Sequence, residues 1–225
     1  MLSLLEEQKD VRKNVKKIIC LFLLGLMVLS GCSTDEKSEK KDKVLTIDSD
    51  SDYAYDLSNN LELNKHHNDI ALVEITDIGG TSNYNDKLAI YVDIYTYGKA
   101  VVKAVYKGNL KIDDKIAFTR LGGKLSYNEW KKGLLQKQVD MLEDAGYTSV
   151  VSEYEHDIPV EKNKTYLVFL DHTSSQKENE YAISGFAYGM REVEDPDHLT
   201  DRDDIRVKNN VSGKYEPLQS VVALE

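Results

Sequence analysis

The chain has 225 residues, 30% of them charged, and a formal net charge of −10. Such an acidic chain lacks the concentrated positive face with which proteins bind nucleic acid, so we expect no nucleic-acid partner. Its two cysteines, Cys20 and Cys32, precede the expected folded region, which excludes a disulfide, a thiol nucleophile and a thiolate metal site there.

The first 31 residues have the pattern of a cleavable signal peptide. Four basic residues at positions 12–17 precede an uncharged apolar run at 18–29. This run is too short to span a bilayer comfortably, which takes roughly 20 helical residues. Acidic residues before Arg12 are atypical of the start of a signal peptide, and we therefore hypothesise that translation begins at Val11 rather than Met1.

The apolar run ends in Leu29-Ser30-Gly31-Cys32, which resembles the lipobox of bacterial lipoproteins. In that family the signal peptidase cleaves before the cysteine, here between Gly31 and Cys32, and the thiol becomes a diacylglyceryl cysteine. The freed amine can receive a further chain such as palmitate, and two or three chains anchor a protein stably. The alternative is a chance cysteine behind an ordinary signal peptide.

The resemblance implies a lipoprotein on the extracytoplasmic face of the cell membrane, with the membrane as a partner through Cys32. Removal of residues 1–31 takes away five of the 29 basic and three of the 39 acidic side chains, so the mature net charge is −12. Residues 32–67 are expected to form the lipidated cysteine and a flexible tether, because 33–43 contain no apolar side chain to bury and the rest stays largely polar. We place a single folded domain at 68–225.

Runs of β-branched and aromatic residues predict that this domain is mainly β. Gly98 interrupts the longest run and predicts a bulge or bend in one strand, whereas Gly79-Gly80 and Gly122-Gly123 predict turns. Short connections favour an antiparallel sheet that closes into a barrel. The expected strands are 70–78, 88–106, 115–121, 165–170, 181–190 and a short edge strand within 215–224.

One inserted amphipathic helix is expected at about residues 127–145. Ser126 and Glu129 fit a capping box, and Gly146 suits the position just past the helix end. We interpret the apolar face as core packing, with docking of a partner as the alternative. The residues of this apolar face, at helical spacing, are Trp130, Leu134, Met141, Leu142 and Ala145.

The order of these segments resembles a group of exported bacterial domains with an OB-like, netrin/TIMP-like β-barrel. The likeness covers about residues 68–193 and implies an antiparallel OB-like barrel with one inserted helix, without a shared catalytic motif. The domain lacks the cysteines of the netrin pattern, so the inhibitor role of that family is not expected. The segments that carry the likeness are Val105-Tyr106-Lys107-Gly108, Gly122-Gly123, Tyr166–Leu170 and Ser184-Gly185-Phe186.

The search for catalytic or metal-binding motifs yields two weak candidates. Asp171-His172 follows an apolar strand, but no glycine-flanked nucleophile elbow accompanies it. The acidic segment 195–204 offers carboxylates for a weak calcium site, yet it lacks the glycine and closing glutamate of an EF-hand. A solvated loop is the preferred interpretation, and we predict neither a cofactor nor a metal. The carboxylates of this loop are Asp195, Asp197, Asp201 and Asp203.

Two functional hypotheses follow. The first is a non-enzymatic binding module at the cell surface whose ligand is a protein, a peptide or a cell-wall component; fourteen tyrosines are available to stack on sugars or peptides. The alternative is a hydrolase or metal-dependent enzyme whose site residues are scattered along the chain. The substrate-binding protein of a transporter is less favoured, because alternating strands and helices are missing.

Overall fold

The computed structural model describes residues 42–49, 53–173, 179–199 and 204–222. The chain from Asp42 onward forms one compact unit. The predicted signal peptide, its cleavage site at Gly31 and the lipidation residue Cys32 lie outside the described residues.

This unit begins before residue 68, where we expected the tether to end. Strand β1, Val44–Asp48, and helix α2, Asn60–His66, already belong to it. Two side chains of β1, Leu45 and Ile47, pack on a small hydrophobic cluster, and Leu63 of α2 is fully buried in a larger one. A few apolar side chains in a polar stretch are therefore enough to fold it onto the domain.

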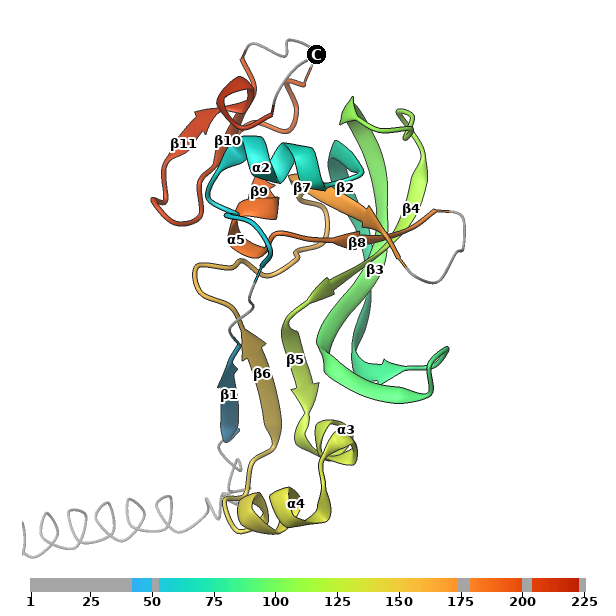
Figure 1. The fold of residues 1–225 in the computed structure, drawn as a ribbon, viewed down its shortest axis with the longest axis vertical. Helices are drawn as coiled ribbons and strands as arrows, with labels where there is room; N and C mark the ends of the chain where they lie inside the picture. Colours follow the sequence, from blue (N-terminus) through green and yellow to red (C-terminus); the bar gives the residue numbers. More distant parts are fainter. Residues whose placement is uncertain (1–41, 50–52, 174–178, 200–203, 223–225) are drawn as a thin grey trace, which may run out of the picture. The chain divides into compact units, whose positions relative to one another are not determined.

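The described chain is mainly β, as predicted. Its larger sheet has the strand order β2-β3-β4-β8-β7-β9, and β7 pairs with β2 as well (Figure 1). These pairs are antiparallel except β4 with β8, which is parallel. The strands are β2 (Asp69–Asn85), β3 (Ile90–Lys107), β4 (Lys115–Leu121), β7 (Thr165–His172), β8 (Glu180–Ile183) and β9 (Met190–Glu192).

The irregularity predicted at Gly98 is confirmed. The register of β2 against β3 shifts between Ile75 and Asp77 and again between Ile78 and Gly80, opposite this glycine. A Cβ atom at Gly98 would lie 2.3 Å from the Asp77 carbonyl oxygen, so only glycine allows this approach. The turn predicted at Gly79-Gly80 is wrong: both residues lie within β2, covered by the ring of Tyr97, and the hairpin turns after residue 85 instead.

A smaller sheet has the order β1-β6-β5, with β5 at Gly123–Ser126 and β6 at Ser149–Glu153. Strand β1 runs parallel to β6, and β5 runs antiparallel to it. The turn predicted at Gly122-Gly123 is confirmed, because Gly122 has a φ of +95° and separates β4 from β5.

The single helix predicted at 127–145 is wrong. Three short helices replace it: α3 (Tyr127–Trp130), the 3-10 helix η1 (Lys131–Gly133) and α4 (Gln136–Glu143). Ser126 caps α3 as predicted, accepting a hydrogen bond from the Glu129 amide at 3.2 Å. The break follows from packing, since Gly133 lies against the Tyr91 side chain and the next residue, Leu134, is extended.

The predicted strand 181–190 ends at Ile183. Gly185 takes a φ of +82°, and the chain turns into the short helix α5, Phe186–Gly189. A Cβ at Gly185 would lie 2.9 Å from the Gly189 Cα, so the two glycines allow this tight turn. The chain ends in the hairpin of β10 (Arg206–Lys208) and β11 (Tyr215–Pro217), followed by η2 (Leu218–Ser220).

Hydrophobic clusters lie on both faces of the main sheet. On β2, Ala71, Val73 and Ile75 belong to the first cluster, which also takes in Phe118 and Tyr166. The intervening residues of β2 and β7 belong to the second cluster, beneath α2 and the C-terminal segment. The first part of β2 and most of β7 are therefore buried on two sides, which explains the apolar runs Ile70–Val73 and Tyr166–Leu170.

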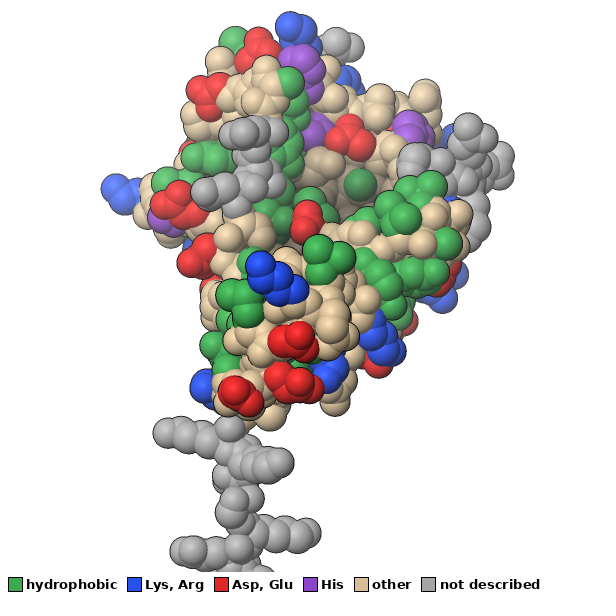
Figure 2. Space-filling model, turned by 60° about the horizontal axis from the view of Figure 1, so that its bottom comes forward, with side chains coloured by type: hydrophobic (Ala, Val, Ile, Leu, Met, Phe, Trp, Pro, Cys, Tyr) green, Lys and Arg blue, Asp and Glu red, His purple; other side chains and the backbone are tan. Residues whose placement is uncertain are grey.

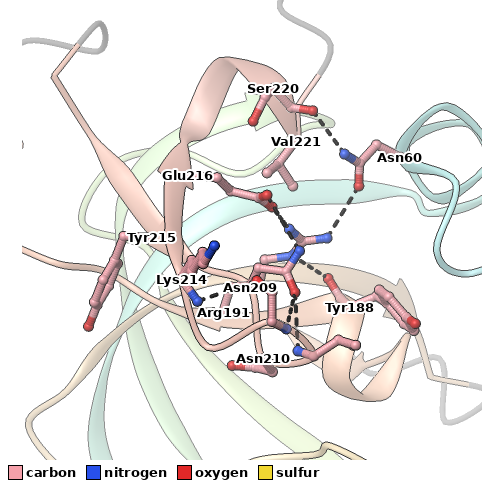
Figure 3. Close-up of polar contacts among 12 residues, drawn as sticks. Asn60, Tyr188, Arg191, Asn209, Asn210, Lys214, Tyr215, Glu216, Ser220 and Val221 are labelled. Atoms are coloured by element: carbon pink, nitrogen blue, oxygen red, sulfur yellow. Dashed lines mark hydrogen bonds and ion pairs between the residues drawn. The ribbon is translucent and has the colours of Figure 1, made fainter.

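A buried polar network fastens α2 and the C-terminal hairpin to the sheet (Figure 3). Arg191 is 2% exposed and forms an ion pair with Glu216. Its other guanidinium nitrogens donate to the Tyr188 carbonyl at 2.9 Å and to the Asn60 side chain at 3.2 Å. The Asn60 side chain in turn donates to the Ser220 carbonyl at 2.8 Å. Because Arg191 uses all of its nitrogens in this way, we assign the network a structural role.

Candidate functional site

A cleft with a volume of about 570 Å³ opens beside the turn between β2 and β3. Strands β3, β4 and β8, the end of β7, the segment leading into α5 and Tyr53 supply the other walls. Figure 2 shows a hollow with hydrophobic side chains along its rim and Asp, Glu and His side chains nearby. The volume is typical of small-molecule sites, which span about 300–1,000 Å³. The lining includes Tyr53, Lys87, Leu88, Val92, Tyr95, Thr119, Arg120, His172, Glu180, Ala182, Ser184 and Phe186.

Aromatic rings form one wall of this cleft. Tyr53 meets Phe186 edge to face with ring centroids 5.6 Å apart, and Tyr154 stacks on Phe186 at 4.0 Å. Burial raises the pKa of Tyr53 to about 12 against the opposing effect of a hydrogen bond with the Gly185 backbone, so its hydroxyl stays protonated. Phe186 has a φ of +44°, a conformation that costs a bulky residue about 1–3 kcal/mol. The surrounding packing therefore holds this wall in place before any ligand arrives.

A buried ion pair lies at the cleft. The Arg120 side chain is 6% exposed and that of its partner Asp157 is 8% exposed. Arg120 also donates to the Ile158 carbonyl at 2.6 Å, which ties β4 to the segment after β6. Burial lowers the pKa of Arg120 and raises that of Asp157, although each charge opposes the shift of the other. Loss of solvation thus outweighs the attraction for both groups.

A chain of hydrogen bonds joins Tyr55, His67 and Asp171. Tyr55 Oη lies 3.0 Å from His67 Nε2, and His67 Nδ1 lies 2.9 Å from Asp171 Oδ2. This sequence of a hydroxyl, an imidazole and a carboxylate resembles a catalytic triad in which tyrosine would be the nucleophile. Burial, however, raises the pKa of Tyr55 and the Asp171 charge adds to the shift, so the phenolate is disfavoured. The His67 side chain is only 1% exposed, so we interpret the chain as a structural tie of the N-terminal segment to β7.

The predicted pair Asp171-His172 separates in the structure. Asp171 turns toward His67, whereas His172 lies at the cleft with its side chain 63% exposed. Burial alone would raise the pKa of Asp171, but hydrogen bonds from His67 and Ser184 and the His67 charge lower it overall. A carboxylate with a lowered pKa is a poor base, so Ser184 at the cleft is not activated by it.

The motif Val105-Tyr106-Lys107-Gly108 has a structural explanation. Lys107 Nζ donates to the carbonyls of Asn64 and His67, both at 2.6 Å, and so caps the C-terminal end of α2. Gly108 has a φ of +96°, and a Cβ there would lie 1.9 Å from Asp69 Oδ1. The motif therefore joins α2 to the end of β3 and lies away from the cleft lining.

The predicted cation loop is described only in part, because Asp201 and Asp203 lie outside the described residues. Asp195 accepts hydrogen bonds from within its own loop, from the Asp197 amide at 3.2 Å and from His198 Nδ1 at 2.8 Å. Within the described residues, no group of three or more His, Cys, Asp or Glu side chains could hold a metal ion.

Of the cleft residues, the sequence pointed only to His172, as part of a catalytic candidate, and to Ser184-Gly185-Phe186, as part of the likeness to OB-like domains. One signal was available for Arg120: along β4, Ile116, Phe118 and Arg120 alternate onto the buried side, so a cation occupies a core position. Tyr53, Phe186 and Ala182 carry no comparable signal, because they meet only when β8, α5 and the N-terminal segment come together.

No protein-family model, curated protein or solved structure matches this chain. The helices in the described part of the chain are all too short or too polar to cross a membrane.

Proposed function

We propose that this protein is an extracytoplasmic lipoprotein, anchored through Cys32, whose OB-like barrel binds a cell-wall component in the cleft. Five strands support the barrel assignment, because their pairings run β2-β3-β4-β8-β7 and return to β2. Strand β7, the fourth of these in the chain, lies beside β2, the first, as in a Greek key. An OB-fold is a five-stranded Greek-key barrel of this kind.

The position of the cleft carries the functional proposal. OB-folds bind oligonucleotides and oligosaccharides on the face of their second and third strands, together with the loops between strands one and two and between strands four and five. The cleft is lined by the corresponding elements: β3, β4, the β2–β3 turn, and His172 and Thr173 at the end of β7.

The charges in the cleft favour a sugar or peptide over a nucleic acid. Lys87 and Glu180 form an ion pair at 3.2 Å, and Arg120 is neutralised by Asp157. These cations are therefore not available to a row of phosphates. The aromatic wall provides stacking faces for a sugar ring, and Thr119 and Ser184 provide hydroxyl groups.

The anchor is tested by growing cells with an alkyne analogue of palmitate and detecting the label on the protein. We expect the wild-type chain to be labelled and the Cys32→Ala variant to be unlabelled and released from the membrane fraction. An unlabelled wild-type protein would refute the lipoprotein assignment.

Ligand binding is tested by filling the cleft. Ala182 is half-buried on β8 and lines the cleft, so Ala182→Trp places a bulky ring there without deleting an existing contact. Val211→Trp adds the same ring to an exposed position in the β10–β11 turn and is the matched control. Titration calorimetry with soluble fragments of peptidoglycan should show binding that the first variant loses and the second keeps.

Equal binding by both variants, or no binding by the wild type, would contradict the proposed site. Hydrolysis of the peptidoglycan fragments during the calorimetric titration would instead support the hydrolase hypothesis. Tighter binding of an oligonucleotide than of these fragments would point to the other ligand class of OB-folds.

A further inference from the structure

The segment between β5 and β6 exposes the two most accessible large hydrophobic side chains in the described chain. Met141 is 76% exposed and Leu135 is 75% exposed. None of the residues of α4 is buried, although Leu142 packs partly against the small cluster. These two apolar side chains therefore contribute almost nothing to the fold of the domain.

The chain from Cys32 enters the domain beside this same segment. Strand β1 runs parallel to β6, so that its first residue, Val44, pairs with Ser149 just after the α4 segment. Lys43 Nζ donates to the Ala145 carbonyl at 2.6 Å and lies 5.0 Å from the centre of the Tyr147 ring. Asp42 accepts a hydrogen bond from Thr148. The entry point is thus held against the residues that follow α4.

The length of the tether limits how far this end can move from the membrane. Nine residues, 33–41, separate Cys32 from Asp42 in the sequence. Fully extended, the chain from Cys32 to Asp42 spans at most about 35 Å. A lipid on Cys32 therefore keeps the end of the domain that carries the α4 segment close to the bilayer (Figure 1).

We propose that Leu135 and Met141 insert into the membrane interface and dock the domain with the α4 segment toward the lipid. This inference rests on the proposed lipid anchor. Charge does not drive the contact, because Lys131, Lys132 and Lys137 are balanced by nearby acidic residues; those acidic residues are Glu129, Asp140, Glu143 and Asp144. The two apolar side chains and the acyl chains supply the attraction, so docking should depend little on anionic lipid.

The test places a fluorescent probe at residue 141 of the full lipidated protein. The mature chain has no other free thiol, because Cys32 is its single cysteine and carries the lipid. A Met141→Cys variant is labelled with a nitrobenzoxadiazole probe and reconstituted into vesicles of phosphatidylcholine and phosphatidylglycerol. Ile112→Cys is the matched control, since Ile112 is 64% exposed in the turn between β3 and β4, at the other end of this unit in Figure 1.

Doxyl-labelled phosphatidylcholine should quench the probe at 141 about twofold or more and leave the probe at 112 nearly unchanged, because only the first reaches the acyl boundary. A third protein carries the probe at Lys137→Cys, with and without the changes Leu135→Glu and Met141→Glu. Quenching at 137 should be lost with the two glutamates, which replace exposed side chains and leave the fold intact.

Equal quenching at 141 and 112 in the lipidated protein would overturn the docking and leave the anchor standing. A protein that carries no lipid on Cys32 would overturn the anchor, and the docking inference with it.

Discussion

The ion pair between Arg120 and Asp157 gives a quantitative test of the structure around the cleft. Both side chains are less than one-tenth exposed. Removal of one partner leaves an uncompensated buried charge, which costs about 3–5 kcal/mol. We therefore expect Asp157→Leu to lower the free energy of unfolding by about 4 kcal/mol, a large part of the stability of a single domain.

The double variant Arg120→Met/Asp157→Leu should recover much of this loss. Desolvation outweighs attraction in the pKa of both groups, so the pair itself contributes little net stability. The loss that the double variant does not recover comes from the Ile158 carbonyl, which no longer has Arg120 as its hydrogen-bond donor, at a cost of about 1–3 kcal/mol. The double variant should therefore be more stable than Asp157→Leu alone.

Urea denaturation followed by circular dichroism measures these differences. With a slope of about 2 kcal/mol per molar urea, a loss of 4 kcal/mol moves the midpoint by about 2 M. A loss below about 1 kcal/mol for Asp157→Leu would show that the carboxylate is not a buried partner of Arg120. The single variant Arg120→Met completes the set; a double variant whose loss equals the sum of the Arg120→Met and Asp157→Leu losses would show that the side chains are not coupled.

Three further outcomes follow from the contacts described above. Gly98→Ala should destabilise the domain by about 1–3 kcal/mol in thermal unfolding, because its Cβ meets a neighbouring backbone oxygen; Gly146→Ala, which meets nothing within 4 Å, should cost about 1 kcal/mol for its left-handed backbone. Because the pKa of Asp171 is lowered in the folded protein, its carboxylate stabilises the fold at a pH above the ordinary aspartate pKa near 4. This contribution is lost as the pH falls through the lowered pKa. The gap between the urea midpoints of wild type and Asp171→Asn should therefore shrink on acidification, and a constant gap would contradict the assignment. Lys107→Met should cost about 1.5–3 kcal/mol and speed amide exchange in α2, whereas Lys99→Met, an exposed change on the same strand, should leave both unchanged.

Features that depend on neighbours in the chain could be predicted from the sequence. The strand at 115–121, the irregularity at Gly98 and the cap at Ser126 each follow from side-chain type and local backbone preference. The same reasoning was wrong at Gly79-Gly80, because a glycine pair suits an irregular strand as well as a turn, and the ring of Tyr97 decides between them.

Other features depend on residues that are far apart in the chain. The apolar spacing at 127–145 predicts one helix, but packing of Tyr91 against Gly133 favours three short ones. The pairing of β4 with β8 joins strands separated by the whole α4 segment and β6, and hydrophobic patterning cannot specify such a partner.

The sequence by itself determined the composition-level properties of this protein: an acidic chain, a mainly β domain, and an N-terminal pattern that predicts a lipid on Cys32. Only the tertiary structure decided where the domain begins, which strands pair, and that Arg120, Tyr53 and Phe186 line one cleft. The physical reason is that local preferences are encoded over a few neighbouring residues, whereas burial and long-range pairing depend on which distant side chains exclude water together.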